Sequence, residues 1–294
     1  MIRLVNKHTG RQFLLEPQSP DKCYKRPHYG AKFDDYDTSG FDECLPTIEA
    51  CQYPFADKET QIFIPDHGEL WSIPWRYERG ADSIYLAASG HIFSYLFEKQ
   101  ITLRHDELIL DYQITNQAEE TLYFLWSAHP LLQVSSGCQI VLGREVREVF
   151  LNWSSDPNMG EFADRLTWPF LLGESTEYDF SRVQAKSFGR AVKCFTDVLT
   201  EGWAGVYYPE SDESLLFEFD TQSVPYLGIW MCYGGWPPDS PQKHLTVALE
   251  PCSGRPDSLA ESIARGECTS LQPNQRKAWS IKMRMTRGLP VQGA

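Results

Sequence analysis

The fold is decided by a stretch in which apolar and polar side chains alternate, Glu107–Thr115, with the sequence ELILDYQIT. Its apolar residues stand at every second position from Leu108 to Ile114, so they would face one side of an extended chain. This alternation predicts a half-buried β-strand. The apolar segment Ile101–Arg104 precedes it, and the two residues between them, 105–106 (His-Asp), predict a hairpin turn.

The same alternation recurs nearer the C-terminus, where polar residues separate Trp279, Ile281, Met283 and Met285. This segment predicts a second strand with one apolar face. Shorter apolar runs bounded by turn residues predict further strands at Arg11–Glu16, Ser83–Ala87, Ile92–Phe97, Leu122–Ser127, Ala204–Tyr208, Leu215–Phe219 and Leu245–Glu250. Period-two patterns therefore dominate the chain.

Helical periodicity is scarce, and its best candidate is Ser258–Arg265. In this segment Leu259 and Ile263 lie four residues apart, on one face of a helix. Asp257 is the predicted N-cap, and Gly266 is the predicted C-terminal stop. We therefore expect one or two short helices in the whole chain.

Together these patterns predict an all-β fold, a large antiparallel β-sandwich of two sheets with one or two short helices. No stretch has the composition of a linker, and no charge run or internal repeat divides the sequence. We therefore expect a single domain over residues 1–294. The polar, proline-containing stretch Pro17–Asp37 predicts an irregular surface segment.

The charge balance argues against several classes of partner. The 294 residues include 27 Lys and Arg against 40 Asp and Glu, which gives a formal net charge of −13. Clustered positive charge is what binds phosphates, so neither nucleic acid nor an anionic membrane is an expected partner. Residues 1–16 lack the apolar core of a signal peptide, and no run reaches the ~18 apolar residues of a membrane span. We therefore expect a soluble cytoplasmic protein.

Cysteine usage points to thiols that serve packing. The eight cysteines are scattered along the chain, with no CxxC pair and no cysteine-histidine cluster at zinc spacing. No group of carboxylates shows the spacing of a calcium site. The sequence thus favours reduced, buried thiols and predicts no metal site.

Three segments place ionisable residues beside turn residues at strand ends, where all-β scaffolds usually carry their sites. They are residues 65–71 (PDHGELW), 124–130 (FLWSAHP) and 247–257 (VALEPCSGRPD). A single histidine at a strand end is more often a packing residue than a catalyst. Glu250 is harder to dismiss, because an acid in line with Val247 and Leu249 would be partly desolvated.

The order of these motifs resembles the aldose 1-epimerase (galactose mutarotase) family. The resemblance rests on His67-Gly68, then His129 after Asn116 and an apolar strand, then Leu249-Glu250-Pro251, and then Pro256-Asp257. Residues 40–47 (GFDECLPT) are similar to a segment of bacterial epimerase-like members of this family. The likeness extends from about Phe33 to Met285.

The resemblance implies a β-sandwich of the galactose mutarotase type, without a cofactor, that holds a small sugar in a cleft on one sheet. By motif position, His129 matches the general acid, Glu250 the general base and His67 a second histidine that holds the sugar. These residue types suit the reaction independently, because anomer interconversion needs a base at the C1 hydroxyl and an acid at the ring oxygen. Trp71 and Trp230 are candidate platforms for the apolar face of the sugar.

The sequence also departs from the family pattern. Where galactose-acting members carry an arginine in a Gly-x-Arg-like motif, this chain has Asp42 and Glu43. These acids are candidates to accept hydrogen bonds from sugar hydroxyls, and a structural role at a turn is about equally expected. A Leu-Asp-His segment is missing, and Lys193 or Asp197 lies in the corresponding part of the chain.

Two other functions remain open at this stage. The fold would suit a non-catalytic carbohydrate-binding protein, or a phosphosugar epimerase or lyase of similar architecture. A phosphosugar site would need arginines at the cleft, for which Arg76, Arg79 and Arg255 are candidates. The presence of both His129 and Glu250 favours the enzyme, because binding alone needs no acid and base pair. The sequence leaves the sugar's identity and the oligomeric state open.

Overall fold

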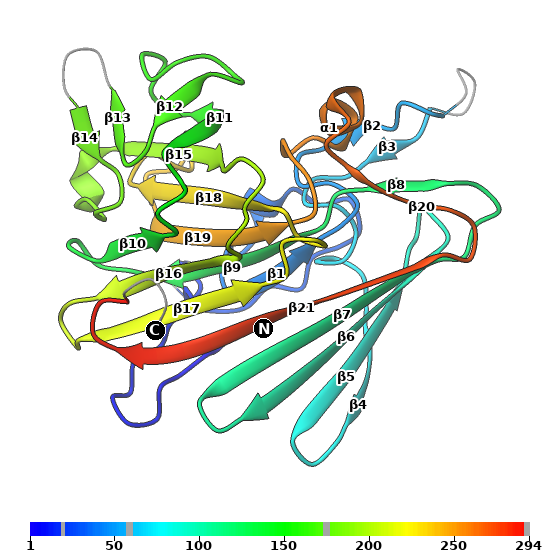
Figure 1. Ribbon diagram of the computed structural model, residues 1–294, viewed down its shortest axis with the longest axis horizontal. Helices are drawn as coiled ribbons and strands as arrows, with labels where there is room; N and C mark the ends of the chain where they lie inside the picture. The colour runs from blue at the N-terminus through cyan, green and yellow to red at the C-terminus, as the bar shows by residue number, and fades with distance from the viewer. Residues whose placement is uncertain (19–20, 57–60, 173–176, 291–294) are drawn as a thin grey trace.

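The structure, a computed structural model, describes residues 1–18, 21–56, 61–172 and 177–290. Two large antiparallel sheets make up most of this part of the chain, which confirms the predicted all-β sandwich (Figure 1). One α-helix, α1 (Leu259–Arg265), and two short 3-10 helices, η1 (Phe33–Asp35) and η2 (Lys186–Phe188), accompany the strands.

The first sheet has eight strands and the second has seven. In spatial order the eight are β10 (Gln139–Leu142), β16 (Trp203–Tyr208), β17 (Glu213–Phe219), β21 (Arg276–Arg287), β7 (Glu107–Asn116), β6 (Tyr95–Arg104), β5 (Ser83–Ser89) and β4 (Arg76–Arg79). The seven are β1 (Phe41–Cys44), β9 (Ser127–Gln133), β19 (Leu245–Cys252), β18 (Tyr226–Tyr233), β15 (Arg190–Phe195), β11 (Glu148–Ser154) and β12 (Arg165–Thr167). Three two-stranded pairs complete the fold: β2 (Cys51–Gln52) with β3 (Phe63–Ile64), β8 (Leu122–Phe124) with β20 (Thr269–Leu271), and β13 (Phe170–Leu172) with β14 (Glu177–Asp179).

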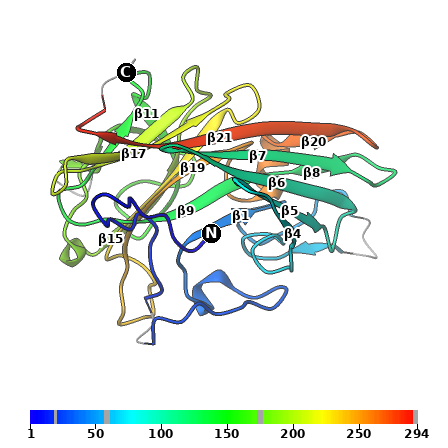
Figure 2. The same cartoon turned by 90° about the horizontal axis from the view of Figure 1, so that it is seen from below.

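The alternating segment that decides the fold lies in the middle of the eight-stranded sheet. β7 pairs with β6 on one side and with β21 on the other, and the predicted hairpin turn at residues 105–106 joins β6 to β7. Its apolar side chains face the seven-stranded sheet, which lies across from it (Figure 2). Tyr112 stacks on Trp279 of β21 with ring centroids 5.6 Å apart, and Trp126 packs against both rings from the other layer. Burial of such aromatic area supplies much of the stability of a sandwich.

Three predicted strands are wrong in their extent. Ile92–Phe97 is strand only from Tyr95, where β6 begins and continues to Arg104. The other two are broken by distant partners. Arg11–Glu16 forms only isolated bridges, although Leu15 donates a backbone hydrogen bond to Leu131 of β9. Leu122–Ser127 is split between β8 and β9, because the backbone N–H of Leu125 bonds Pro46 and that of Trp126 bonds the Ser253 hydroxyl. Both breaks come from long-range partners that a local pattern does not reveal.

The helix is confirmed, but its predicted N-cap is wrong. Ser258 is the N-cap residue, and the first helical N–H, that of Leu259, bonds the hydroxyl of Thr47 from a distant loop at 3.0 Å. Gly266 ends the helix in the left-handed conformation (φ 70°), as predicted. Asp257 is therefore free to point away from the helix end.

Three further predictions concern the cysteines, the stretch Pro17–Asp37 and membrane-spanning segments. All eight cysteines are free and six of them are buried. Pro17–Asp37 is largely irregular where it is described, but it ends in η1, whose Phe33 is buried. Among the described residues, no helix has the length and apolar character needed to cross a membrane.

Candidate active site

An open cavity of about 200 Å³ lies on the outward face of the seven-stranded sheet. Side chains from five adjacent strands form its floor, and loop residues form its rim. The residues that line it are Phe33, Thr38, Ile48, His67, His129, Leu131, Trp153, Lys193, Trp230, Trp236, His244, Thr246, Glu250 and Asp257. Its mixed aromatic and ionisable lining is typical of a small-molecule site.

The structure brings His129 and Glu250 together on neighbouring strands. The register between β9 and β19 pairs Leu131 with Ala248 and Ser127 with Cys252, so positions 129 and 250 lie opposite each other. Both side chains therefore point to the same face of the sheet. The imidazole Nε2 of His129 lies 4.0 Å from Oε1 of Glu250, and both side chains are almost fully buried.

Glu250 is held by one of its two carboxylate oxygens. Its Oε2 pairs with the ammonium of Lys193 and accepts a hydrogen bond of 3.5 Å from the Ser127 hydroxyl. Its Oε1 is buried and has no hydrogen-bond partner among the described residues. A buried carboxylate oxygen without a partner is costly, so a free oxygen here suits a group that meets a ligand.

Lys193 reaches Glu250 across β18, the strand that separates them in the sheet. On β18, Trp230 is the partner of Lys193, and Gly228, two residues earlier, is the partner of Glu250. A Cβ atom at Gly228 would lie 3.3 Å from Oε2 of Glu250, within the space that the ion pair occupies. The glycine therefore leaves room for the contact.

Asp257 is the second acid beside Lys193. Its Oδ1 lies 3.6 Å from the Lys193 ammonium, and its Oδ2 accepts a 2.8 Å hydrogen bond from the Asn152 amide. Burial raises the pKa of Asp257 and outweighs the opposing charge of Lys193. Burial alone would lower the pKa of Lys193, but the charges of Asp257 and Glu250 outweigh that effect and raise it. Lys193 is thus a cation held between two carboxyl groups.

His67 lies on a tight turn that follows β3. Its φ is 57°, and the next residue, Gly68, has φ 67° and packs so closely that a Cβ atom would lie 2.1 Å from the Leu45 carbonyl oxygen. Only glycine suits that position. The turn directs the His67 ring against Phe33, with centroids 4.1 Å apart, and against His129, with centroids 4.9 Å apart.

His129 lies deeper than His67 and is electrostatically distinct. Burial, together with the nearby positive charges that His67 and Lys193 can carry, lowers the pKa of His129 well below its ordinary value. The ring is therefore neutral near pH 7. Its Nδ1 is buried and has no hydrogen-bond partner within the described part of the chain.

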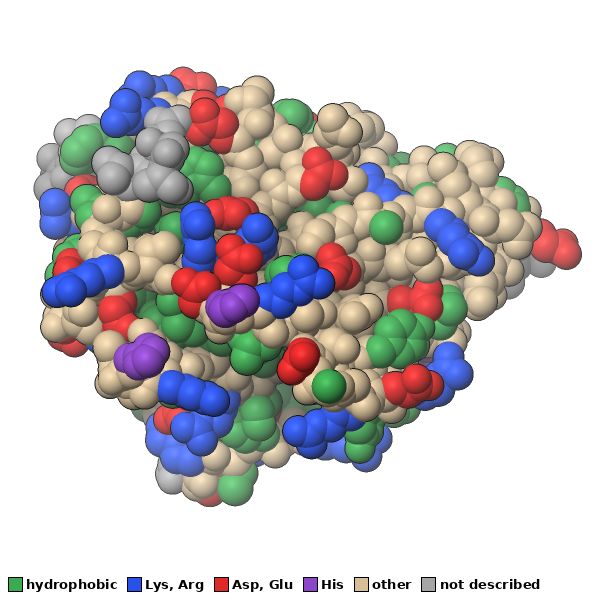
Figure 3. Space-filling model, turned by 60° about the horizontal axis from the view of Figure 1, so that its bottom comes forward, with side chains coloured by type: hydrophobic (Ala, Val, Ile, Leu, Met, Phe, Trp, Pro, Cys, Tyr) green, Lys and Arg blue, Asp and Glu red, His purple; other side chains and the backbone are tan. Residues whose placement is uncertain are grey.

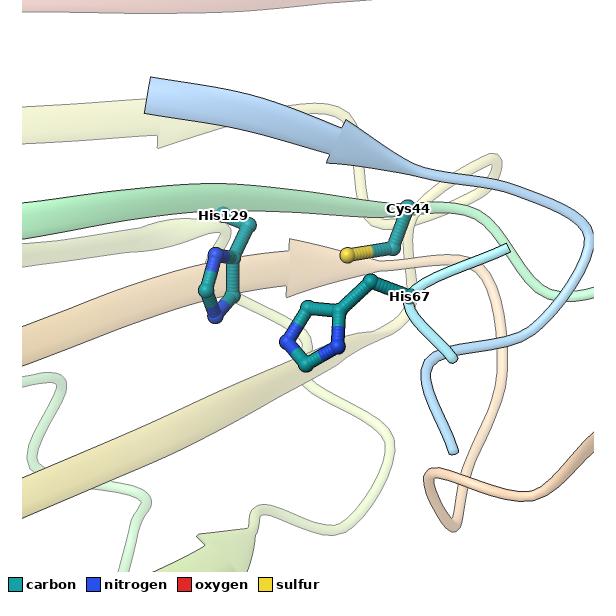
Figure 4. Close-up of side chains that lie close together, drawn as sticks. All are labelled: Cys44, His67 and His129. Carbon is teal, nitrogen blue, oxygen red and sulfur yellow. The ribbon is translucent and has the colours of Figure 1, made fainter. Parts of the chain in front are cut away.

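The two histidines also lie beside a thiol (Figure 4). Cys44 of β1 points to the same face of the sheet, and one ligand atom from each of Cys44, His67 and His129 lies within 4.8 Å of the other two. These residues could hold a metal ion, an arrangement that their spacing in the sequence does not reveal.

An aromatic wall borders the cavity on the side of β18 and β11. Trp230 lines the cavity between Trp153 and Trp236, with centroid distances of 5.8 Å and 6.2 Å. Trp71 does not line the cavity. Its indole packs edge-on to Phe33, and its N–H donates to the Asp66 carbonyl, so it supports the rim from behind.

Asp42 and Glu43 point to opposite faces of β1. Glu43 does not line the cavity but lies between the two sheets, where it pairs with Lys99 and accepts a 3.1 Å hydrogen bond from the Trp126 indole. Asp42 stands opposite His129 in the register but also does not line the cavity. Burial raises its pKa to about 6, against the opposing effect of the N-terminal ammonium.

The arginines suggested for a phosphosugar lie elsewhere. Arg76 and Arg79 are exposed on β4, at the edge of the other sheet. Arg255 pairs with Asp197 and with Glu267, so Asp197 too is engaged away from the cavity. Of the two candidates for the missing family aspartate, the structure places only Lys193 in the cavity.

Comparison with known proteins identifies the fold. No family model matches the chain, and neither does any curated protein. Three solved structures resemble it over most of their length. A galactose mutarotase-like protein from Lactobacillus casei has a TM-score of 0.68 at 15% identity and covers 97% of this chain and 92% of its own. A putative aldose 1-epimerase from Escherichia coli K12 has a TM-score of 0.63 at 19% identity, covering 85% and 84%.

The third, a galactose mutarotase-like protein from Clostridium acetobutylicum, has a TM-score of 0.62 at 14% identity, covering 97% of this chain and 89% of its own. At such low identities the likeness defines the architecture and not the chemistry. The chain therefore has the galactose mutarotase-like β-sandwich fold, as the resemblance of its motifs predicts.

Proposed function

We propose that the protein is an isomerase that interconverts the α and β anomers of a free, neutral aldose. One observation carries the proposal. His129 Nε2 and Glu250 Oε1 lie 4.0 Å apart at the floor of an open cavity, and each side chain keeps a buried polar atom without a partner among the described residues. An imidazole and a carboxylate at this separation can serve the two oxygens that share one anomeric carbon.

The reaction needs two proton transfers and no redox step. Glu250 takes the proton from the C1 hydroxyl while His129 gives one to the ring oxygen. The bond between C1 and the ring oxygen breaks, and C1 and its own oxygen form a carbonyl. After rotation about the C1–C2 bond, the two groups exchange roles and the ring closes on the other face of C1. His67 would hydrogen-bond a sugar hydroxyl and so hold the ring in place.

The low pKa of His129 suits the acid in this scheme. A ring oxygen is a weak base, and a protonated imidazole of lowered pKa is a stronger acid than an ordinary one. The neutral ring that prevails near pH 7 can still donate one N–H hydrogen bond to the sugar. Lys193 occupies the other oxygen, Oε2, so Oε1 of Glu250 is left for the complementary step.

The cavity chemistry favours a neutral sugar over a phosphorylated one. Lys193 is the only lysine or arginine among the lining residues that the structure describes, and two carboxyl groups already surround it. A phosphate dianion would need unpaired cations. Trp230 offers a flat face that suits the C–H side of a pyranose. The free cysteines are consistent with a reducing compartment, and we place the reaction in the cytoplasm.

Glu250→Gln tests the proposal. It keeps the shape of the side chain and removes the base, so kcat/KM for mutarotation should fall by a factor of about 100 or more while sugar binding persists. Polarimetry on freshly dissolved single anomers measures the rate, using neutral hexoses, pentoses, deoxy sugars and phosphosugars. His129→Asn should be similarly damaging.

Glu43→Gln is the matched control. Glu43 is also a buried glutamate paired with a lysine, but it lies on the opposite face of the same sheet. It should keep the wild-type rate per folded molecule. A Glu250→Gln protein that mutarotates its sugar as fast as the wild type would rule out the assignment.

A non-catalytic sugar-binding protein is the second candidate, and one observation favours it. The Glu250 carboxylate is already paired with the Lys193 ammonium through Oε2, and a carboxylate held in this way also suits a simple hydrogen-bond acceptor for a sugar hydroxyl. The same panel decides between the two: a wild-type protein that binds a sugar but accelerates mutarotation of none would be a binding protein.

A further inference from the structure

Three side chains of the kind that bind transition metals lie close together, two of them in the cavity lining and the third buried beside them, and the proposed reaction gives the third no task. They are Cys44 on β1, His67 on the turn after β3 and His129 on β9 (Figure 4). Their ligand atoms lie within 4.8 Å of one another. We propose that this cluster binds Zn²⁺, and that the bound ion switches the isomerase off by occupying its histidines.

The carboxylate of Asp66, the residue before His67, supports a ligand role for the His67 ring. Nδ1 of His67 lies 2.9 Å from Oδ1 of Asp66, and the other Asp66 oxygen accepts a 2.8 Å hydrogen bond from the Phe33 N–H. In the neutral ring this bond places the proton on Nδ1 and leaves the lone pair on Nε2. A carboxylate that orients a histidine in this way is the usual companion of a metal-bound imidazole. Figure 4 shows the other ring nitrogen of His67 directed toward His129.

An unsatisfied atom beside the cluster supports it further. The buried Oε1 of Glu250 has no hydrogen-bond partner among the residues described. Oε1 lies 4.0 Å from His129 Nε2, so it is near enough to serve as the fourth ligand once the ion is bound. A thiolate, two neutral imidazoles and one carboxylate would balance the charge of a divalent ion.

The donor set selects the metal. Thiolate and imidazole together favour zinc over magnesium or calcium, which take oxygen ligands, and four ligands of this kind form the tetrahedral geometry of zinc. Ligand atoms around zinc lie ~3.5 Å apart, so the cluster would have to contract by about 1 Å. Rotation of the His67 ring can supply most of this movement. Binding releases the thiol proton of Cys44 to solvent, and no oxidation occurs.

The effect on activity follows because the ion and the proposed reaction would use the same two imidazoles. An ion held by His129 would take the lone pair on which the proposed reaction returns its proton, and an ion held by His67 would block the hydrogen bond of that ring to the sugar. Zn²⁺ would therefore inhibit mutarotation reversibly, and a chelator would restore it. This inference goes beyond the proposed function, because metal binding can be measured without any sugar.

Titration of the chelator-treated full-length protein with Co²⁺ tests the site directly. Cobalt substitutes for zinc and gives a thiolate-to-metal charge-transfer band when a cysteine ligates it. We expect one equivalent of Co²⁺ to produce this band, Zn²⁺ to displace it, and Cys44→Ser to lose it. Cys252→Ser is the matched control, since Cys252 is equally buried and packs in the same apolar cluster as Cys44 but lies outside the ligand group. It should keep the band.

A second readout guards against misfolding. Zn²⁺ should raise the Tm of the wild type and of Cys252→Ser, and it should leave the Tm of Cys44→Ser and of His67→Gln unchanged. His67→Gln removes a ligand from a turn rather than from a strand, so it tests the site if Cys44→Ser does not fold. No band in the wild type, or an undiminished band in either ligand variant, would overturn the proposal. A band without mutarotation of any sugar would instead leave the metal site standing and reject the isomerase.

Discussion

Glu250 and Glu43 are two buried glutamates of the same sheet, and each pairs with a buried lysine. They differ in whether both carboxylate oxygens have a partner. Lys99 and the Tyr112 hydroxyl contact one oxygen of Glu43 and the Trp126 indole contacts the other, so both are used inside the protein. Glu250 keeps one oxygen free at the cavity. The comparison separates a structural acid from one that is available to a ligand.

Lys193→Met should destabilise the protein by about 3 kcal/mol, because it leaves the Glu250 carboxylate buried without its cation. The double variant Lys193→Met/Glu250→Gln should recover much of this loss, since the Glu250 charge is then removed together with its cation and only Asp257 loses a partner. Denaturant unfolding of both proteins measures the free energies. Equal stability of the single and double variants would show that Lys193 is not the partner that matters to Glu250.

The sequence could nominate His129, Glu250 and His67 through the resemblance of their motifs, and the structure brings the three into one cavity. It could not separate Asp42 from Glu43, and the reason is physical. Neighbours in a strand point to opposite faces, so only one of the two could face outward once β1 is known to be a strand. The sequence pattern gave no strand there, because β1 has only four residues.

At the scale of elements, β18 governs how the site is assembled. It separates β19, which carries Glu250, from β15, which carries Lys193. The contact across it passes close to Gly228, where a Cβ atom would crowd the Glu250 carboxylate. A glycine inside a strand weakens the strand, so its presence at this position indicates a close approach.

Gly228→Ala should lower both stability and activity. The added Cβ would lie 3.2 Å from the Phe195 ring and 3.3 Å from the Glu250 carboxylate, in a part of the protein that is fully packed. Overpacking of this kind costs about 1–3 kcal/mol, and displacement of Glu250 should reduce kcat/KM for mutarotation. Thermal unfolding and polarimetry measure the two effects.

Gly143→Ala is the control for that experiment. Gly143 lies after β10, and a Cβ atom there would meet no atom closer than 3.6 Å. The substitution should leave stability and rate close to the wild type. A Gly228→Ala protein that is equally unaffected would show that the ion pair does not depend on the glycine.

Across the whole molecule, the sequence predicts the sandwich better than it predicts the cavity. β7 and β21 follow a two-residue period because one face of β7 is buried along most of its length and one face of β21 along its middle. The cavity rim comes from loops such as those carrying Phe33, Ile48 and Trp236, which have no period and meet only after folding. Asp257 shows the same limit. It is predicted to cap the helix, but the N–H of Leu259 bonds the hydroxyl of Thr47 from a distant loop, and Asp257 lines the cavity instead.

The surface carries the net charge of −13 without a single-sign face in the view of Figure 3, where acidic and basic side chains are interspersed. The strong electrostatic effects are therefore local and buried. His244, which lines the cavity against Trp236, is such a group, since burial first and then the charge of Lys186 lower its pKa to about 4. Its ordinary value is about 6.5.

The pH dependence of stability should report His244. Its pKa is lower in the folded than in the unfolded state, so the unfolded chain binds the extra proton first as the pH falls. The contribution of His244 to the free energy of unfolding is fully present above about pH 6.5. It is lost progressively down to about pH 4, by at most about 3 kcal/mol. His244→Asn should therefore lose less free energy of unfolding than the wild type between these pH values, as measured by denaturant titration.

His105→Asn, in the exposed turn between β6 and β7 where asparagine tolerates the positive φ of 55°, should follow the wild-type curve. Parallel curves for all three proteins would mean that His244 takes up its proton as readily in the folded protein as in the unfolded chain.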